Sequence, residues 1–126
     1  MAFDYWAVRL LPGVFSITTF GVGVIVADPR TGEAKSKFRD VRPLLHAHQN
    51  RDALVGQLSA FIEEVQQESK DRPRFPKYLD GVAENRMNEV RVEARKTIAA
   101  ESIESALSLL YSTLVCGDGL TAEAGL

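Results

Sequence analysis

Positively charged side chains recur at alternate positions in three stretches that resemble β-strands. Side chains of a strand alternate between its two faces, so residues two apart share a face. In a single antiparallel sheet, one face would therefore collect several cations and a tyrosine. A guanidinium group binds phosphate or carboxylate through two parallel hydrogen bonds, so such a face suits an anionic partner. The residues concerned are Tyr5, Arg9, Lys35, Lys37, Arg91 and Arg95.

The stretch 20–28 (FGVGVIVAD) adds to this face a patch without side chains, which we call the glycine floor. Alternation places Gly21 and Gly23 together, opposite the larger side chains of the same strand. Glycine inside a strand is costly and usually marks a bulge or a close approach by a backbone or ligand. The plainer interpretation is a solvated face, neutralised by Glu33 and Glu93, whose glycines serve packing alone. The expected core face consists of Phe20, Val22, Val24 and Val26.

Residues 71–77 (DRPRFPK) form a second basic segment. Its two prolines lack backbone donors and restrict the residues before them, which predicts a loop and not a helix. Arg74 and Phe75 are candidate docking residues, with the Phe75 ring inserted into a partner. An ordinary connecting loop is the alternative.

Residue types that commonly bind metals or carry catalysis do not form a recognisable set. His46 and His48 would diverge by about 200° on a helix, which predicts surface residues and no metal site. Cys116 is expected to be an inert thiol. The pair Gly21 and Gly23 lacks the third glycine and the helix of a dinucleotide-binding loop. We therefore predict no metal, no cofactor and no catalytic residues.

Composition indicates one globular domain. The chain has 126 residues, of which 45% are hydrophobic and 25% charged. A net charge of −2 argues against nucleic acid or an acidic membrane as the partner. The single cysteine excludes an internal disulfide. No apolar run approaches the ~20 residues needed to span a bilayer, and we expect no leader peptide. We expect a cytoplasmic protein with one domain over residues 1–117 and a loosely ordered tail over residues 118–126.

Hydrophobic periodicity predicts the order of the elements. Strands are expected over 3–11, 20–28, 33–38 and 88–99, and helices over 50–69, 78–87 and 102–117, with a helical turn within 40–48. Asn50 and Ser102 are candidate N-caps. The resulting fold class is α+β: a mainly antiparallel sheet of about four strands is packed on two amphipathic helices, and its other face is open.

Three segments resemble a known family. Residues 5–12 (YWAVRLLP) and 22–32 (VGVIVADPRTG) are similar to the opening strand and the glycine-bearing hairpin of the family called domain of unknown function 3037. Residues 90–111 resemble its last strand and helix. The chain departs from the family pattern at Thr18 and Gly21, where glutamate and asparagine are expected. The resemblance implies a small bacterial or phage protein of no established activity, with some members encoded beside kinases of the HipA type.

Three functions remain open on these observations. The first is a non-catalytic interaction or accessory module, antitoxin-like or phage-borne, that acts through its sheet face, edge strand or basic loop. Its partner would be an unknown protein, such as a HipA-type kinase, or a second copy of the chain. The second is a binder of an anionic ligand or nucleic acid through Arg9, Arg91 and Arg95. The third is a small enzyme that acts at the glycine floor.

Overall fold

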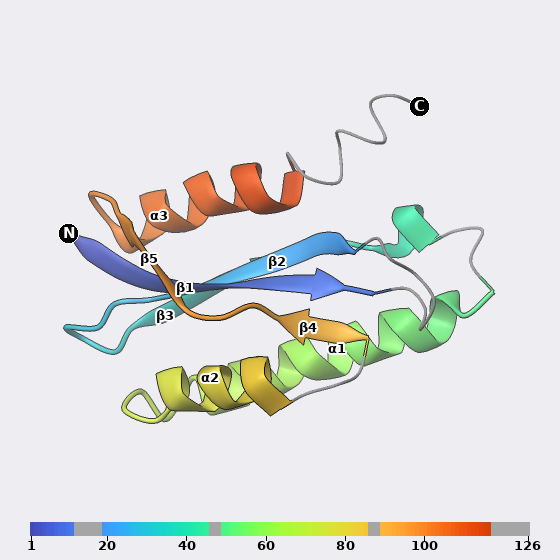
Figure 1. Ribbon diagram of the computed structural model, residues 1–126, viewed down its shortest axis with the longest axis horizontal. Helices are drawn as coiled ribbons and strands as arrows, with labels where there is room; N and C mark the ends of the chain where they lie inside the picture. The colour runs from blue at the N-terminus through green and yellow to red at the C-terminus, as the bar shows by residue number, and fades with distance from the viewer. Residues whose placement is uncertain (12–18, 46–48, 86–88, 117–126) are drawn as a thin grey trace.

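The structure is a computed structural model that describes residues 1–11, 19–45, 49–85 and 89–116. Within these residues, five strands and three helices follow one another, with two shorter helical segments (Figure 1). The elements are β1 (Ala2–Leu10), β2 (Phe20–Ala27), β3 (Ala34–Phe38), η1 (Arg42–Leu45), α1 (Arg51–Glu68), α2 (Phe75–Asn85), β4 (Val90–Val92), β5 (Lys96–Ala99), α3 (Ile103–Leu110) and η2 (Tyr111–Cys116). The predicted tail, His46 and His48 lie outside the described residues.

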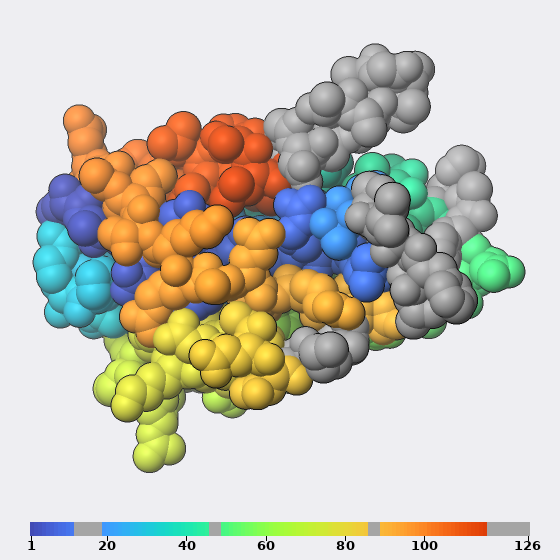
Figure 2. Space-filling model, viewed as in Figure 1, coloured from blue at the N-terminus to red at the C-terminus, as the bar shows by residue number. Residues whose placement is uncertain are grey.

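The strands form one antiparallel sheet in the order β3-β2-β1-β4. The strand predicted over 88–99 is present but interrupted, because residues 93–95 leave the ladder. Its two pieces pair with opposite ends of β1, β5 with residues 2–5 and β4 with residues 8–10. Figure 2 shows this segment in orange, running across the molecule between α3 and α2. The α+β class with a mainly antiparallel sheet is therefore confirmed.

Helices cover both faces of the sheet, so the prediction of an open face is wrong. The first core cluster joins one face to α1 and α2, and a second joins the other face to α3 (Figure 1). The cause is β2, whose described side chains are buried on both sides. A strand that is apolar on both faces requires a covering layer on each. The second cluster consists of Phe3, Val24, Val26, Ile103, Ala106 and Leu110.

A bulge in β2 changes which side chains share a face. Val8 lies opposite Gly23, whereas Arg9 lies opposite Gly21, so Val22 is an extra residue between them. Val22 therefore packs in the first core cluster, while Val24 packs in the second. The prediction that four large residues of this strand share one face is wrong. The bulge also places Gly21 and Gly23 on opposite faces, so they form no common floor.

Gly23 lies beneath an aromatic ring of the neighbouring strand. A Cβ at this position would stand 2.2 Å from the ring of Phe38, which packs edge-on against Phe61. We predict that Gly23→Ala lowers the free energy of unfolding by about 1–3 kcal/mol, because the ring must leave its site. In the control Gly81→Ala, the new Cβ meets nothing within 4 Å. This helical substitution is expected to raise stability by about 0.5–1 kcal/mol in urea unfolding. A neutral Gly23→Ala would contradict the packing.

Helix α2 begins earlier than the helix that the sequence predicted over residues 78–87. It starts at Phe75 and has Pro76 as its second residue. The first amides of a helix have no partner within it, so proline is tolerated there. The predicted loop is therefore correct only up to Arg74. At the other caps, the Ser102 side chain accepts a hydrogen bond from the Ser105 amide as expected, but that of Asn50 makes no capping hydrogen bond.

Candidate functional site

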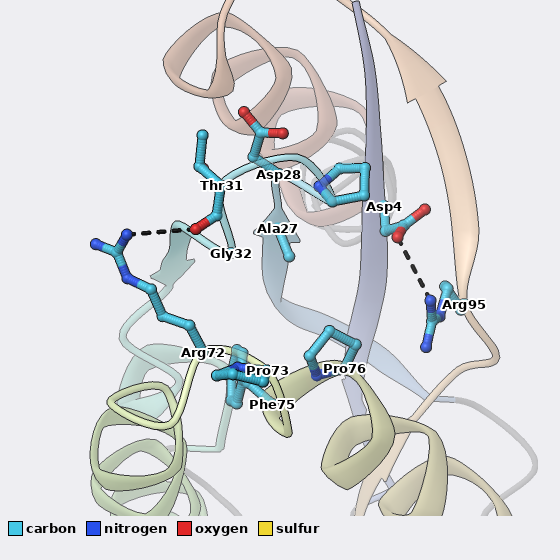
Figure 3. Close-up of a pocket in the computed structure, with 11 residues that line it drawn as sticks. Asp4, Ala27, Asp28, Thr31, Gly32, Arg72, Pro73, Phe75, Pro76 and Arg95 are labelled. Carbon is cyan, nitrogen blue, oxygen red and sulfur yellow. Dashed lines mark hydrogen bonds and ion pairs between the residues drawn. The ribbon is translucent and has the colours of Figure 1, made fainter.

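A cleft of about 400 Å³ opens at one end of the sheet. It lies between the turn that joins β2 to β3 and the loop that joins α1 to α2, and we call it the turn–loop cleft (Figure 3). Its volume is within the range of ligand pockets, roughly 300–1,000 Å³. The lining residues are Asp4, Ala27, Asp28, Pro29, Thr31, Gly32, Arg72, Pro73, Phe75, Pro76 and Arg95.

Apolar groups supply much of the cleft lining. Three of the chain's prolines stand around it, and Ala27 and Phe75 lie between them. Phe75 is only 1% exposed and stacks on Tyr78, with ring centroids 6.1 Å apart. Its ring belongs to the protein's own core, so the expectation that Phe75 inserts into a partner is wrong. The cleft instead offers an apolar surface, formed by its prolines, on which a partner's side chain could pack.

Arg72 forms one wall of the cleft. Its stem packs on Gly32, where an added Cβ would stand 2.8 Å from Arg72 Cβ and where φ is +77°. Its Nη1 donates a 3.4 Å hydrogen bond to the carbonyl of Thr31, across the cleft edge (Figure 3). Arg72 takes part in no ion pair within the described parts of the chain. Most of its guanidinium donors are thus available to an incoming group.

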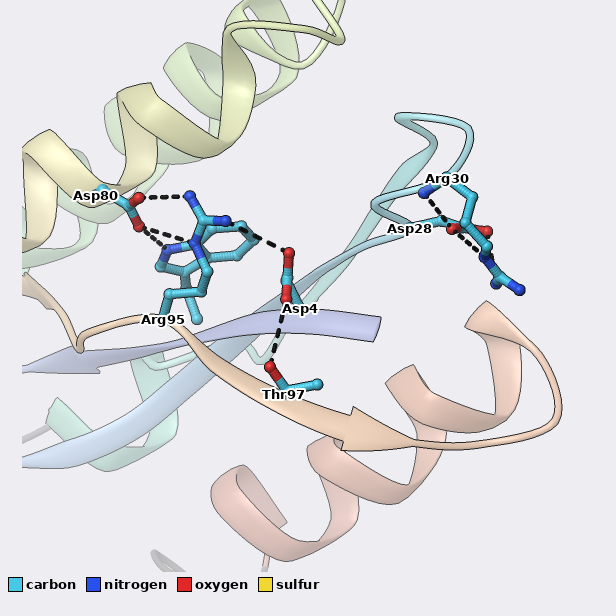
Figure 4. A network of polar contacts seen from close by, with 7 residues as sticks. Asp4, Asp28, Arg30, Asp80, Arg95 and Thr97 are labelled. Atoms are coloured by element: carbon cyan, nitrogen blue, oxygen red, sulfur yellow. Dashed lines mark hydrogen bonds and ion pairs between the residues drawn. The ribbon is translucent and has the colours of Figure 1, made fainter. Parts of the chain in front are cut away.

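The opposite wall carries a network around Arg95 (Figure 4). The guanidinium of Arg95 is paired with Asp80 of α2, lies 3.4 Å from Asp4 Oδ2, and stacks over Trp6 at 5.2 Å from the ring centroid. Trp6 is fully buried and donates a 3.0 Å hydrogen bond from Nε1 to Asp80 Oδ1. Thr97 donates to the second oxygen of Asp4 at 3.4 Å. This Asp80–Arg95 network fastens α2 to the β1–β5 edge.

The Asp80–Arg95 network should make stability depend on pH. Burial raises the pKa of Asp80, but hydrogen bonds from Arg95 and Trp6 outweigh it, so the pKa lies below its ordinary value. A lowered folded-state pKa contributes stability above the unfolded value, which is lost as pH falls through the folded one. We predict that Asp80→Asn destabilises the protein by about 1 kcal/mol at neutral pH. The difference should shrink below about pH 4 in urea unfolding; a constant difference would contradict the assignment.

Asp28 is held away from the cleft. Its carboxylate accepts hydrogen bonds from the backbone amide, Nε and Nη2 of Arg30, at 2.9–3.0 Å (Figure 4). The side-chain hydrogen bond from Arg30 is the main cause of the lowered pKa of Asp28. The carboxylate turns to the outside of the turn in Figure 3. It therefore supports the shape of the cleft and presents little negative charge to it.

The structure removes Arg95 from the face on which the sequence placed the cations, and it covers that face with α3. Lys35 forms a 2.8 Å ion pair with Glu104, and Lys37 Nζ lies 4.4 Å from the centroid of Tyr111, so both lysines tie β3 to the α3–η2 segment. Arg95 lies on the opposite side of the sheet, against Trp6. Tyr5 packs against the second core cluster.

Arg9 and Arg91 do stay together, directly opposite each other on β1 and β4. Arg9 donates to the hydroxyl of Thr19 at 2.6 Å and lies 3.9 Å from the carboxylate of Glu93. Arg74, whose side chain is 85% exposed, lies 3.8 Å from Asp71 and does not line the cleft. Of the predicted site residues, only Phe75 and Arg95 reach the cleft.

Arg72, Asp4 and Asp80 were missed as site residues. The motif Asp-Pro-x-Thr-Gly at 28–32 indicated a turn, and the prolines of 71–77 indicated a loop. No local pattern shows that these segments meet, because about forty residues separate them.

Comparisons of the chain with protein-family models, curated proteins and solved structures found no significant match. No helix in the described residues is long and apolar enough to cross a membrane. Within the same residues, no three His, Cys, Asp or Glu side chains gather as metal ligands would.

Proposed function

We propose that the protein is a non-catalytic interaction module that holds a segment of a partner protein in the turn–loop cleft. The observation that carries the proposal is the composition of this cleft. Three prolines and Ala27 give it an apolar surface above the buried Phe75, and Arg72 stands at its edge without a carboxylate partner among the described residues. Grooves lined by apolar rings with a few polar groups are a common way of recognising extended peptides.

The polar groups of the cleft favour binding over catalysis. Its carboxylates are engaged by arginines, and the hydroxyl of Thr31 accepts a 3.1 Å hydrogen bond from the amide of Glu33. A nucleophile requires a base within hydrogen-bond reach, and the Thr31 hydroxyl donates no hydrogen bond to a base among the described residues.

Anion binding remains a second candidate, supported by the adjacent arginines Arg9 and Arg91. Arg95 would not contribute, since Asp80 and Asp4 already neutralise it. If this candidate holds, the protein should bind a fluorescent oligonucleotide at low salt, and Arg9→Glu should abolish that binding. Unchanged binding by Arg9→Glu would remove it.

Two partners should be tested first. We also propose that the chain belongs to the domain of unknown function 3037 family, which it resembles. That resemblance suggests a HipA-type kinase as the first partner to test. The other is a second copy of the chain, which sedimentation over a range of concentrations would detect. The single cysteine supports a cytoplasmic location for the interaction.

Site-specific photo-crosslinking tests the proposed cleft. A benzoylphenylalanine replaces Pro73, which lines the cleft, or Ser108, which is exposed on α3. Each protein is mixed with the purified candidate partner and irradiated. We expect a crosslink from position 73 that excess wild-type protein suppresses, and little from position 108. Equal crosslinking from both positions, or crosslinking from 108 alone, would place the interaction elsewhere.

A further inference from the structure

We propose that the segment held in the turn–loop cleft carries a carboxylate that pairs with Arg72. This inference rests on the proposed function, because it takes the cleft as the docking site. It adds the chemistry of the occupant, which is a peptide that carries an acidic residue next to an apolar one. Three observations on the cleft lead to this choice.

The first observation is that Arg72 is already positioned for a ligand. Its stem is fixed against Gly32, and one donor is used on the Thr31 carbonyl. An arginine held in this way loses little conformational freedom when it binds. The remaining donors of a guanidinium match the two oxygens of a carboxylate. A ligand carboxylate would therefore make a charge-assisted contact that no described residue of the chain supplies.

The second observation is the charge of the facing wall. Arg95 is the other arginine of the cleft, and it is bound by Asp80 and Asp4. Those two carboxylates leave Arg72 as the cation available to a ligand. One cation facing an acidic wall favours a single negative charge over a phosphate group, which carries about −1.5 to −2. The occupant is therefore a carboxylate and not a phosphate.

The third observation is that the cleft also suits the rest of a peptide. Asp4 accepts its two hydrogen bonds at 3.4 Å each, which leaves acceptor capacity for a peptide N–H. The prolines that line the cleft offer an apolar surface to a neighbouring side chain. A peptide combines an N–H donor, an apolar side chain and a carboxylate within a few residues. A small anion offers only the negative charge.

The test uses dodecapeptides displayed on phage and selected against the wild-type protein. We expect aspartate or glutamate beside an apolar residue in the enriched sequences. For a selected peptide, Arg72→Ala should weaken binding by about tenfold or more. The matched control Arg74→Ala removes an equal charge from the same loop, outside the cleft, and should change the affinity less than about twofold. Glu→Gln in the peptide should weaken binding as much as Arg72→Ala, and replacement by phosphoserine should also weaken it.

A second variant separates the two proposals. Thr31→Trp would obstruct the edge of the cleft, and circular dichroism would confirm that it folds. The selected peptides could lack acidic residues, or could bind Arg72→Ala as tightly as the wild type. If Thr31→Trp abolishes binding of such peptides, the carboxylate inference is wrong and the cleft remains the docking site. If selected peptides bind Thr31→Trp as well as the wild type, or if no peptide is enriched, the proposed function itself is contradicted.

Discussion

Phe75→Ala is expected to lower the free energy of unfolding by about 3–5 kcal/mol in urea. The ring is 1% exposed, stacks on Tyr78 and belongs to the core cluster that α1 and α2 share with the sheet. Its removal would leave a cavity at the first residue of α2, where the surrounding backbone can collapse only partly. The loss should appear without any partner present, because the contacts are all internal.

Arg74→Ala is the matched control for this change, since its side chain is 85% exposed and touches only Asp71 among the described ion pairs. It should alter stability by less than about 0.5 kcal/mol. A Phe75→Ala variant as stable as Arg74→Ala but defective in partner binding would contradict the core role. It would restore Phe75 as a side chain that inserts into the partner.

Ala106→Glu is expected to lower the free energy of unfolding by more than about 4 kcal/mol, or to prevent folding. Ala106 is fully buried where α3 packs on Val24 and Val26 of β2. A glutamate there would be too large for the space, and its carboxylate would lose water without gaining a partner. Thermal unfolding followed by circular dichroism measures the effect, with Ala106→Ser as a milder variant that should still fold.

Leu109→Glu provides the comparison on the same helix. Leu109 is 53% exposed, so a glutamate there should change stability by about 0.5 kcal/mol or less. The contrast depends on α3 lying against the sheet. If Ala106→Glu were tolerated as well as Leu109→Glu, the face of the sheet under α3 would be uncovered, and the sheet would have the open face that the sequence predicted.

Local patterns were enough to predict the elements and the fold class. Alternating apolar residues located the strands, and helical periodicity located α1 and α3. The placement of α3 required another observation, that β2 is apolar at nearly every position from Val22 onward. A continuous apolar run indicates a strand buried on both faces. Alternation alone assigned one face to the core and left the other to solvent.

The bulge in β2 could not be predicted from composition alone. Glycine in a strand indicates a bulge or a close approach by a neighbouring group. Both occur here, since the bulge lies between Gly21 and Gly23 and the Phe38 ring packs closely on Gly23. Which residue is inserted depends on the register against β1, a long-range property. One inserted residue moves the neighbouring side chains to the other face. This explains why Gly21 and Gly23 were separated. Arg95 left the predicted surface for another reason, because residues 93–95 lie outside the strands β4 and β5.

The cleft depends on contacts between segments distant in sequence. The turn at 28–32 and the loop at 71–77 were each predicted from proline and glycine content, but only the structure shows that residues of both segments line one cleft. The Asp80–Arg95 network is likewise invisible in sequence, since its members lie on β1, α2 and the segment before β5. Arg95 was predicted as a free cation because its partners come from those elements.

The most direct test of the proposed function is a map of amide chemical shifts in the ¹⁵N-labelled protein as an acidic dodecapeptide selected on it is added. If the turn–loop cleft is the docking site, the largest changes should fall on residues 28–32, 71–76 and 95. Residues on the exposed side of α3 should remain unchanged. Changes concentrated on α3, or around Arg9 and Arg91, would contradict the account.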